Sequence, residues 1–539
     1  MSQTATAHID TFARDNLPPR EQWPDLIYEL PELRYPERMN CTAELLDRAI
    51  EAGWGERTAI VAPGLRWRYA ELLAHANRIA HVLVDDWRLI PGNRVLLRGS
   101  NSPMMAACWF AVVKAGGIAV ATMPLLRARE LTDIIDKAQI SHALCDARLA
   151  QELNAARCAC PTLREVGWFA SSERDGLEAR SLGKPAAFAN VDTAADDTAL
   201  LAFTSGTTGK PKATMHFHRD VIAACDCWPR STLRASPDDL FAGSPPLAFT
   251  FGLGGLLLFP MRIGASTLLL EKVSPEQLLA AIGEHRASVL FTAPTSYRAM
   301  APMVSRHDLT SLSKCVSAGE ALPAATRKLW KDATGIEIID GIGSTELFHI
   351  FISHDEAHAR PGATGKPVPG YRACVIDDNG EPLPPGLVGH LAVKGPTGCR
   401  YLADPRQANY VKNGWNCTGD AYLIDEDGHF VYQARTDDMI ISAGYNIAGP
   451  EVEGALLLHP AVAECGVVGV DDAERGQIVK AFIVLKPGHT GDAAMTAALQ
   501  DFVKRTIAPY KYPRAIDYLP ALPRTETGKL QRFRLRGRP

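Results

Sequence analysis

Apolar residues in the first 400 positions form short runs that alternate with stretches of helical spacing. Residues 58–63 (TAIVAP) and 93–99 (NRVLLRG) are typical of strands, whereas residues 69–86 place apolar side chains on one helix face. Strand-like runs recur at 117–123, 141–147, 264–271, 287–294 and 314–320. This alternation predicts an α/β fold with largely parallel sheets.

From about residue 370 the pattern changes to alternating runs that are separated by Asn-Gly or Asp-Gly turns, in 374–395 and 421–434, which predict β-hairpins. Beyond residue 437 we expect a helix, two strands and a second helix, at 450–460, 462–470, 480–486 and 493–507. We therefore predict a large N-terminal domain (residues 1–436) of parallel-rich sheets with a β-hairpin subdomain, and a small α+β C-terminal domain (residues 437–539).

Composition narrows the partners and the compartment. A chain of 539 residues is too long for one compact core, and a net charge of -4 leaves no basic surplus for nucleic acid, which is therefore not expected as a partner. The longest apolar stretch, Leu247–Met261, is too short and too broken by Gly and Pro to span a bilayer. The N-terminus lacks the apolar core of a signal peptide, and the 12 cysteines form no C-x-x-C pair. We expect a cytoplasmic protein with reduced thiols and no membrane partner. The sequence allows a homodimer but does not determine the oligomeric state.

A run of small polar residues follows a predicted strand at 204–212 (TSGTTGKPK). Its glycines let backbone N–H groups converge, its four hydroxyls donate hydrogen bonds, and Lys210 and Lys212 add positive charge. The run therefore has the composition of a phosphate-binding loop, with a solvated surface turn as the alternative. It is not a Walker loop, because Thr204 replaces the first glycine and Pro211 stands in the place of the Ser or Thr.

Three further motifs are ambiguous when each is taken alone. Residues 340–346 (DGIGSTE) lack the third glycine of a dinucleotide fingerprint, which rejects that interpretation. In this loop, Thr345 and Glu346 either bind phosphate and a hard cation such as Mg²⁺, respectively, or form a plain turn. Asp420 in WNCTGD either accepts hydrogen bonds from a ribose diol or simply begins a hairpin. Lys529, in the loop near the end of the chain, is either functional or a solubilising charge.

One metal-like pattern is rejected. HDEAH places His354 and His358 four residues apart around Glu356. The order differs from the H-E-x-x-H of zinc helices and no third ligand is evident, so a solvated helix start is favoured.

Taken together, TSGTTGKPK, GSTE, WNCTGD, ARTDDMI and the final TGK, in this order, resemble the adenylate-forming superfamily of acyl- and aryl-CoA synthetases, luciferases and peptide-synthetase adenylation domains. The resemblance covers nearly the whole chain. Within the superfamily, SAGEALP, DGIGSTELFHIF, TGKPVPGY, RTDDMI and APYKYPR are most similar to benzoate-type CoA ligases.

This resemblance implies an AMP-forming acid–thiol ligase. It would use ATP with Mg²⁺, and CoA as co-substrate, to convert an aromatic acid (2-aminobenzoate or benzoate) into its thioester. The alternatives are an enzyme that loads a carrier protein in trans, a fatty acyl-CoA synthetase, and an ATP-binding regulator without catalytic activity.

The resemblance also implies roles for individual residues. The β- and γ-phosphates would be bound by Thr204, Ser205, Gly206, Thr207, Thr208, Gly209 and Lys210. Thr345 would hold the α-phosphate, Glu346 would bind Mg²⁺, and Lys529 would reach the α-phosphate and the substrate carboxylate. The adenine would be lined by Gly319, Glu320 and Asp340, and the ribose would be bound by Asp420 and Arg435. Ala213 departs from the family, which usually has glycine there.

The acid would lie among Thr250, Phe251, Gly343, His349 and Ile350, although Phe251 and Ile350 would also suit an ordinary core. Asp437 would be the hinge about which the small, mobile domain rotates between the half-reactions. That rotation would bring Gly444 to the CoA tunnel.

Overall fold

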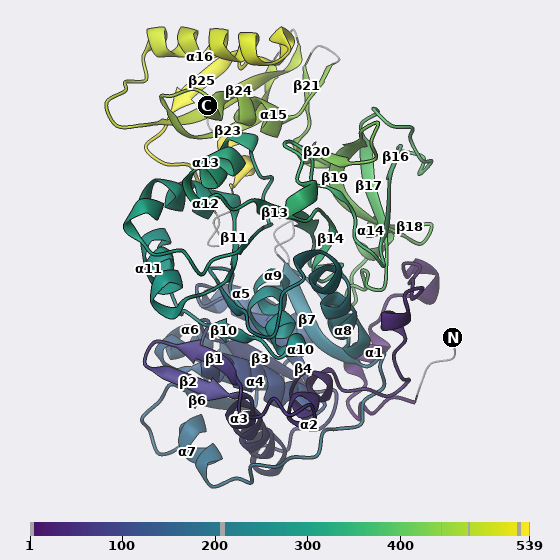
Figure 1. Cartoon of the computed structure of the whole chain (residues 1–539). Coiled ribbons are helices and arrows are strands. Elements are labelled where there is room, and N and C mark those ends of the chain that lie inside the picture. Colours follow the sequence, from purple (N-terminus) through teal and green to yellow (C-terminus); the bar gives the residue numbers. More distant parts are fainter. Residues whose placement is uncertain (1–4, 205–210, 443–444, 473–474, 525–529, 538–539) are drawn as a thin grey trace.

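The computed structural model describes residues 5–204, 211–442, 445–472, 475–524 and 530–537 (Figure 1). It confirms the predicted α/β class. In the described residues, three sheets with their helices form the larger N-terminal part, and a fourth sheet with its helices forms the smaller C-terminal part.

One sheet of the N-terminal part has six strands in the order β6-β5-β3-β4-β7-β8. They are β3 (Arg94–Arg98), β4 (Ile118–Thr122), β5 (His142–Asp146), β6 (Glu165–Phe169), β7 (Thr198–Thr204) and β8 (Lys212–Phe217). All neighbours pair in parallel except β7 and β8. Both faces are covered, because Val95 and Leu97 pack with α4 (Pro103–Lys114), whereas Leu96 packs with α5 (Ala128–Ala138) and α6 (Ala150–Ala159).

A second sheet has nine strands in the order β15-β14-β13-β12-β11-β9-β10-β1-β2. They are β1 (Thr58–Ala62), β2 (Leu65–Arg68), β9 (Leu240–Gly243), β10 (Ser266–Leu268), β11 (Val289–Thr292), β12 (Lys314–Ser317), β13 (Ile338–Gly343), β14 (Ile350–Ser353) and β15 (Lys366–Pro367). The strands from β1 to β13 pair in parallel, and β2, β14 and β15 add antiparallel edges. Parallel strands end at one edge of a sheet, so the loops after β12 and β13 lie close together there.

The third sheet is antiparallel and confirms both predicted hairpins. Its strands are β16 (Arg372–Ile376), β17 (Gly389–Lys394), β18 (Val411–Lys412), β19 (Trp415–Ile424) and β20 (Phe430–Arg435). The hairpin at 374–395 is formed by β16 and β17, and the hairpin at 421–434 by β19 and β20.

The C-terminal part combines helices with the fourth sheet, as an α+β domain should. Its strands are β21 (Ile440–Ser442), β22 (Tyr445–Ile447), β23 (Val462–Asp472), β24 (Gly476–Leu485) and β25 (Ala515–Tyr518), and its helices are α15 (Gly449–Leu457), α16 (Ala493–Thr506) and α17 (Arg532–Arg536). Figure 1 shows this part at the top of the view, next to α12 (Pro294–Met300), α13 (Ala324–Thr334) and β20.

The remaining helices pack against the first two sheets or link the strands. They are α1 (Phe12–Asp15), α2 (Arg48–Glu51), α3 (Tyr69–His81), α7 (Leu177–Leu182), α8 (His218–Asp226), α9 (Thr250–Leu253), α10 (Phe259–Ile263), α11 (Pro275–His285) and α14 (Gln407–Tyr410). α3 continues as a π-helical turn over Val82–Asp86, so the helix predicted at 69–86 is confirmed over its whole length.

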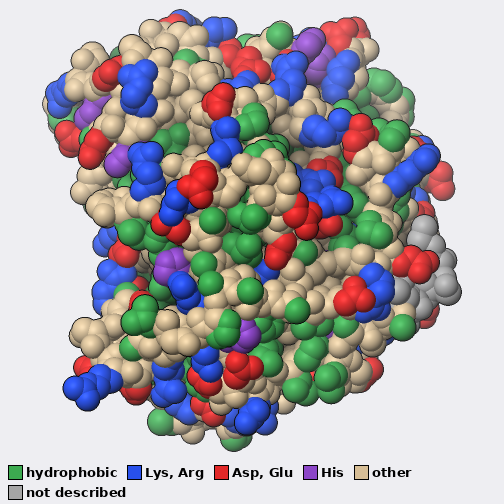
Figure 2. Space-filling view, turned by 60° about the horizontal axis from the view of Figure 1, so that its bottom comes forward, with side chains coloured by type: hydrophobic (Ala, Val, Ile, Leu, Met, Phe, Trp, Pro, Cys, Tyr) green, Lys and Arg blue, Asp and Glu red, His purple; other side chains and the backbone are tan. Residues whose placement is uncertain are grey.

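The surface carries both signs of charge. Figure 2 shows acidic and basic side chains interspersed over the face in view, with hydrophobic side chains in small groups between them. None of the helices in the described residues is long and apolar enough to cross a bilayer.

Candidate functional site

β7 and β8 frame the predicted phosphate-binding loop. Thr204 ends β7 and pairs with Lys212, the first residue of β8. These two strands fix both ends of the loop at one side of the six-stranded sheet. The Thr204 hydroxyl oxygen is buried and has no hydrogen-bond partner among the described residues. The other predicted ligands of this loop, Ser205, Gly206, Thr207, Thr208, Gly209 and Lys210, lie outside the described residues.

Glu346 lies in the loop between β13 and β14 and is only 7% exposed. The Lys212 ammonium lies 2.9 Å from Glu346 Oε1, and the Tyr401 hydroxyl donates to the same oxygen at 2.5 Å. Burial raises the pKa of this carboxyl, but Lys212 and Tyr401 lower it by more, so that the pKa lies below its usual value. Glu346 is therefore a carboxylate, the kind of hard oxygen ligand that suits Mg²⁺.

Thr345, next to Glu346, is held through its backbone by a buried histidine. Burial lowers the pKa of His216 to about 4, so the ring is neutral at pH 7. His216 Nε2 lies 2.8 Å from the Thr345 carbonyl oxygen, which can only accept, so Nε2 carries the proton. Behind the ring, Arg400 and Asp220 form a fully buried ion pair. The Thr345 side chain stays partly exposed and can reach a ligand.

Gly319 and Glu320 follow the carboxyl end of β12, and Asp340 lies within the neighbouring strand β13, where it pairs with Ser317, the last residue of β12. Gly319 has a φ of +91°, in the left-handed region that favours glycine. Burial raises the pKa of Asp340 to about 7, and its Oδ1 has no hydrogen-bond partner among the described residues. This edge of the sheet therefore offers an unpaired acceptor, which suits a ligand N–H such as the amino group of adenine.

Asp420 and Arg435 face each other on the paired strands β19 and β20. Arg435 Nη1 lies 3.1 Å from Asp420 Oδ1 and 3.2 Å from the Thr418 carbonyl oxygen. Burial raises the pKa of Asp420, and Arg435 offsets part of that rise. A Cβ on Gly419 would lie 2.9 Å from Arg435 Nη2, so a larger residue there would push against the guanidinium. The pair can present a carboxylate and a cation together to a diol.

The five residues predicted to surround the acid come together. Thr250 and Phe251 begin α9, and Gly343 at the end of β13 pairs with Ile350 on β14. The rings of Phe251 and His349 are 5.5 Å apart. A Cβ on Gly343 would lie 2.7 Å from the His349 carbonyl oxygen, so a side chain at 343 requires the neighbouring strand to shift. Ile350 is 2% exposed and packs in the main core, which was the alternative considered for it.

His349 is the polar group among these aromatic rings. Burial lowers its pKa to about 3, so the ring is neutral. Its Nε2 lies 3.3 Å from the Phe251 carbonyl oxygen, which assigns the proton to Nε2 and leaves Nδ1 as an acceptor. Nδ1 is buried and has no hydrogen-bond partner in the part of the chain that the structure describes. Phe259 and Trp228 pack against the same ring, with centroids 4.5 and 5.7 Å away.

Three further residues were predicted to have roles outside these clusters. Asp437 belongs to a short 3-10 turn, Thr436–Asp438, between β20 of the third sheet and β21 of the fourth, and its side chain is not described. Gly444 and Lys529 lie outside the described residues. The backbone at 437 thus runs between the third and the fourth sheet.

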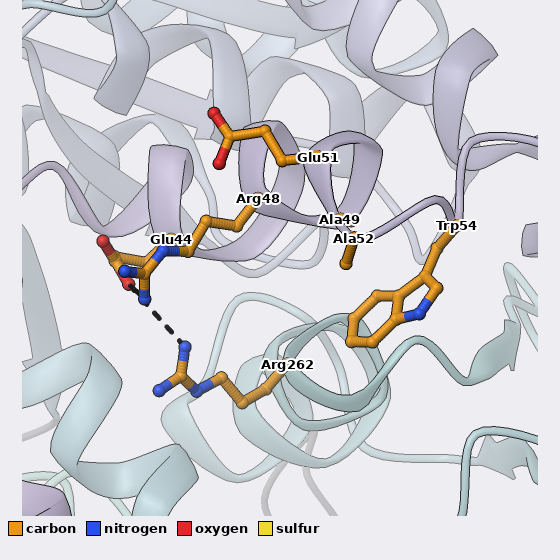
Figure 3. A pocket seen from close by; sticks show the side chains of 7 residues that line it. All are labelled: Glu44, Arg48, Ala49, Glu51, Ala52, Trp54 and Arg262. Carbon is orange, nitrogen blue, oxygen red and sulfur yellow. Dashed lines mark hydrogen bonds and ion pairs between the residues drawn. The ribbon is translucent and has the colours of Figure 1, made fainter.

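A described pocket lies away from all these residues. It has a volume of about 370 Å³ and is lined by Glu44, Arg48, Ala49, Glu51, Ala52, Trp54 and Arg262 (Figure 3). Arg262 lies 3.8 Å from Glu44 and makes two 2.9 Å hydrogen bonds with Asp226. Glu44 thus pairs with both arginines of the pocket, Arg48 and Arg262, and none of the predicted site residues lines it.

The rejected zinc pattern does not form a metal site in the described residues. His354 is buried, with Nε2 3.0 Å from Arg327 Nη2, whereas the His358 side chain is 78% exposed. A separate group of possible metal ligands consists of Asp425, Asp427 and His429, and its two carboxylates pair with an arginine. Arg360 lies 3.0 Å from one of these carboxylates and 2.6 Å from the other.

Sequence reasoning missed the residues that support the site. The sequence predicted Lys212 only as a positive charge of the loop. The signal for a role in the site was its position at the end of the phosphate-binding motif, two residues after Lys210. His216, Tyr401 and Trp228 gave no signal in the sequence. Tyr401 reaches the site because it forms an isolated bridge with Thr214 on β8, a contact between distant parts of the chain.

Known proteins resemble both parts of this fold. The chain matches the AMP-binding enzyme family over residues 47–401 and the AMP-binding enzyme C-terminal domain over residues 451–529. It is 34% identical to benzoate–CoA ligase of Thauera aromatica, over 94% of this chain and 97% of that relative. It is 32% identical to the mitochondrial acyl-coenzyme A synthetase ACSM3 of Mus musculus, over 88% of this chain and 84% of that relative.

A solved structure agrees with these relatives. The anthranilate CoA ligase AuaEII, in complex with anthranoyl-AMP, superposes with a TM-score of 0.90 at 33% identity. The match covers 94% of this chain and 98% of that one.

Proposed function

The chain belongs to the AMP-binding enzymes, as a benzoate-type member of the adenylate-forming CoA ligases, and from this membership we propose that it converts 2-aminobenzoate into its CoA thioester. ATP and CoA are the co-substrates of an AMP-forming acid–thiol ligase. Mg²⁺ with the ATP, a cytoplasmic location and a homodimer are further parts of this proposal.

The reaction needs two displacements. In the first, a carboxylate oxygen of the acid attacks the α-phosphorus of ATP, and pyrophosphate leaves. In the second, the CoA sulfur attacks the acyl carbonyl, AMP leaves, and the thiol proton passes to solvent. The substrates supply both nucleophiles, so the protein has to neutralise charge and align the reacting atoms.

We assign the neutralisation of charge to two loops and a lysine. Thr204 and residues 205–210 would bind the β- and γ-phosphates, and Thr345 the α-phosphate, supported by the hydrogen bond from His216 to its carbonyl oxygen. Glu346 fits a hard cation, because its carboxylate is ionised and the described side chains that contact it both reach Oε1. Bound there, Mg²⁺ would supply charge neutralisation at the phosphates.

The remaining roles follow the clusters of the site. Gly319, Glu320 and Asp340 would line the adenine, and Asp420 with Arg435 would bind the ribose. Lys529 would reach the α-phosphate and the acid carboxylate in the first step only. The boundary between residues 436 and 437, the hinge at Asp437 and the contact of Gly444 with CoA belong to the same proposal.

The observation that carries the choice of acid is the Nδ1 of His349, which lies among aromatic rings and has no hydrogen-bond partner in the described residues. A neutral ring with its proton on Nε2 offers a lone pair at Nδ1, and an ortho amino group offers an N–H to meet it. Benzoate would leave this buried acceptor without a partner. The AuaEII complex, at 33% identity, supports an acid of the same class.

The test is a comparison of acids with ATP and CoA, in which AMP and thioester formation are measured. We expect kcat/KM for 2-aminobenzoate to exceed that for benzoate about tenfold, because a buried polar atom without a partner costs on the order of 1–3 kcal/mol. A higher value for benzoate would contradict the proposed acid while leaving the ligase chemistry intact.

A second candidate is a fatty acyl-CoA synthetase, which the likeness to ACSM3 of Mus musculus favours. Octanoate and longer acids in the same assay decide between the two. The aromatic rings around His349 predict that these flexible chains are poor substrates, whereas turnover of octanoate above that of every aromatic acid would establish the second candidate.

A further inference from the structure

Lys212 contacts the carboxylate to which we assign Mg²⁺, yet the two displacements give it no role. Its Nζ lies 2.9 Å from Glu346 Oε1 and also contacts the Tyr401 hydroxyl. The Lys212 side chain is 22% exposed, whereas that of Glu346 is 9% exposed. A cation therefore reaches from a more open position to a nearly buried carboxylate.

Tyr401 provides a second contact to this carboxylate. Its hydroxyl donates to Glu346 Oε1 at 2.5 Å, and Tyr401 itself is 1% exposed. Two groups thus meet at one oxygen, and one of them is a buried hydrogen-bond donor that fixes the direction of the carboxylate. What Lys212 adds is positive charge, which a buried carboxylate requires when no other cation is present.

Lys212 also has other partners within reach. Its Nζ lies 4.7 Å from the ring centroid of Tyr401 and 5.6 Å from that of Tyr410, distances at which an aromatic face attracts a cation. It begins β8, directly after Pro211. The ammonium can therefore leave Glu346 and remain stabilised, next to the loop assigned to the phosphates of ATP.

Two cations on one carboxylate repel each other, whereas phosphate oxygens attract an ammonium. Building on the proposed function, we propose that Lys212 is a resident counter-cation, which neutralises Glu346 in the nucleotide-free enzyme and moves to a phosphate oxygen when Mg·ATP binds. Lys212 thereby couples the metal position to the phosphate loop. It is a positioning residue in the empty enzyme and a ligand of the nucleotide in the loaded one.

The proposed exchange predicts that removing the charge of Lys212 changes the affinities for metal and for nucleotide in opposite directions. Lys212→Met keeps a side chain of similar length without its charge. Mn²⁺ alone should then bind the nucleotide-free enzyme about tenfold more tightly, because Glu346 has lost its competing cation. Mg·ATP should bind about tenfold more weakly, because a phosphate has lost an ammonium.

Both affinities are measured without turnover. Electron paramagnetic resonance follows Mn²⁺, and calorimetry follows Mg·ATP in the absence of acid. Lys212→Arg keeps the charge and should bring both affinities back toward those of the wild type. Tyr401→Phe removes a hydrogen bond to Glu346 but no charge, and it should weaken the binding of both. Melting curves check that each variant is folded, and Lys212→Gln replaces Lys212→Met if the latter does not fold.

A purely structural tether would give a different pattern. If Lys212→Met weakens both ligands, or leaves Mn²⁺ binding unchanged, the exchange is overturned. If the opposite shifts are found but no aromatic acid is turned over, the cation exchange stands and the proposed acid fails. The two proposals can therefore be tested apart.

Discussion

At the scale of single residues, burial sets the protonation state of His349 in the proposed acid site. An exposed imidazole would gain a proton near pH 6.5, but burial lowers the pKa of His349 to about 3. The ring consequently stays neutral from mildly acid to alkaline pH, and Nδ1 stays an acceptor. Thr250, which is 6% exposed, directly precedes Phe251 at the start of α9.

We predict that Thr250→Val narrows the preference for 2-aminobenzoate over benzoate. Valine keeps the shape of threonine but replaces a hydrogen-bond acceptor by a methyl group. Loss of about one hydrogen bond to the amino group should lower the ratio of the two kcat/KM values several-fold. Thr250→Ser, which keeps the hydroxyl, should retain most of the ratio. An unchanged ratio in Thr250→Val would place the amino group elsewhere in the pocket.

The pKa of His349 adds a condition to this measurement. Protonation would remove the acceptor at Nδ1, but with a pKa of about 3 it occurs only at strongly acid pH. The wild-type ratio should therefore be the same at pH 6 and pH 8, although kcat itself can vary. A ratio that falls between pH 8 and pH 6 would mean that the ring is solvated and has an ordinary pKa.

At the scale of elements, the β13–β14 pair positions both halves of the site. β13 ends at Gly343, the loop that follows carries Thr345 and Glu346, and His349 precedes β14. Gly343 makes this arrangement possible, because an added Cβ would lie 2.7 and 2.8 Å from the carbonyl oxygen and carbon of His349. These are backbone atoms, so no rotamer change can relieve the contact.

Gly343→Ala should therefore overpack this contact, which costs about 1–3 kcal/mol of stability. We expect a higher KM for the aromatic acid and a melting temperature lower by a few degrees. Steady-state kinetics and calorimetry measure the two effects. Gly454→Ala is the matched control, since Gly454 lies in α15 and a Cβ there meets nothing within 4 Å. That change should leave the kinetics unaltered and stabilise the helix. Normal acid kinetics in Gly343→Ala would mean that His349 does not depend on this contact.

The elements that the sequence predicted best are those buried on both faces. Every residue of β3 and of β5 is buried, and each strand has three successive apolar residues at its centre, VLL and ALC. β2 was not predicted, because LRWR is a largely exposed edge strand of only four residues. β14, Ile350–Ser353, was not predicted either, because it has only four residues and directly follows the polar loop of the DGIGSTE motif.

At the scale of the whole molecule, the sequence indicated polar loops but not what supports them. Glu346 was found because its loop resembles a family motif, whereas the Tyr401 that orients it and the His216 that holds Thr345 lie 55 and 129 residues away along the chain. Only the folded sheets bring such residues together. The same holds for Trp228 beside His349, which no local pattern distinguishes from a core residue.

The N-terminal and C-terminal parts of the molecule contact each other through two arginines. Arg298 on α12 donates to the carbonyl oxygens of Ala463 at 3.0 Å and Val462 at 3.5 Å. Arg524 lies 3.5 Å from Glu320 and forms an isolated bridge with Leu530, at the base of the loop that carries Lys529. The base of that loop thus lies beside the position assigned to adenine, and we assign this orientation to the first displacement.

Arg298→Met should accordingly slow the two displacements unequally. Burial lowers the pKa of Arg298, so its guanidinium depends on the two carbonyl oxygens for compensation, and its loss removes two contacts of this orientation only. Acyl-AMP formation, measured by pyrophosphate release without CoA, should fall several-fold, as loss of about 1–2 kcal/mol implies. Thioester formation from supplied aryl-AMP should be unchanged or faster. Lys529→Ala should show the same asymmetry with a much larger loss, and Lys272→Met, at an exposed position, should show neither effect. Equal losses in both displacements would mean that Arg298 stabilises the fold and does not select the orientation.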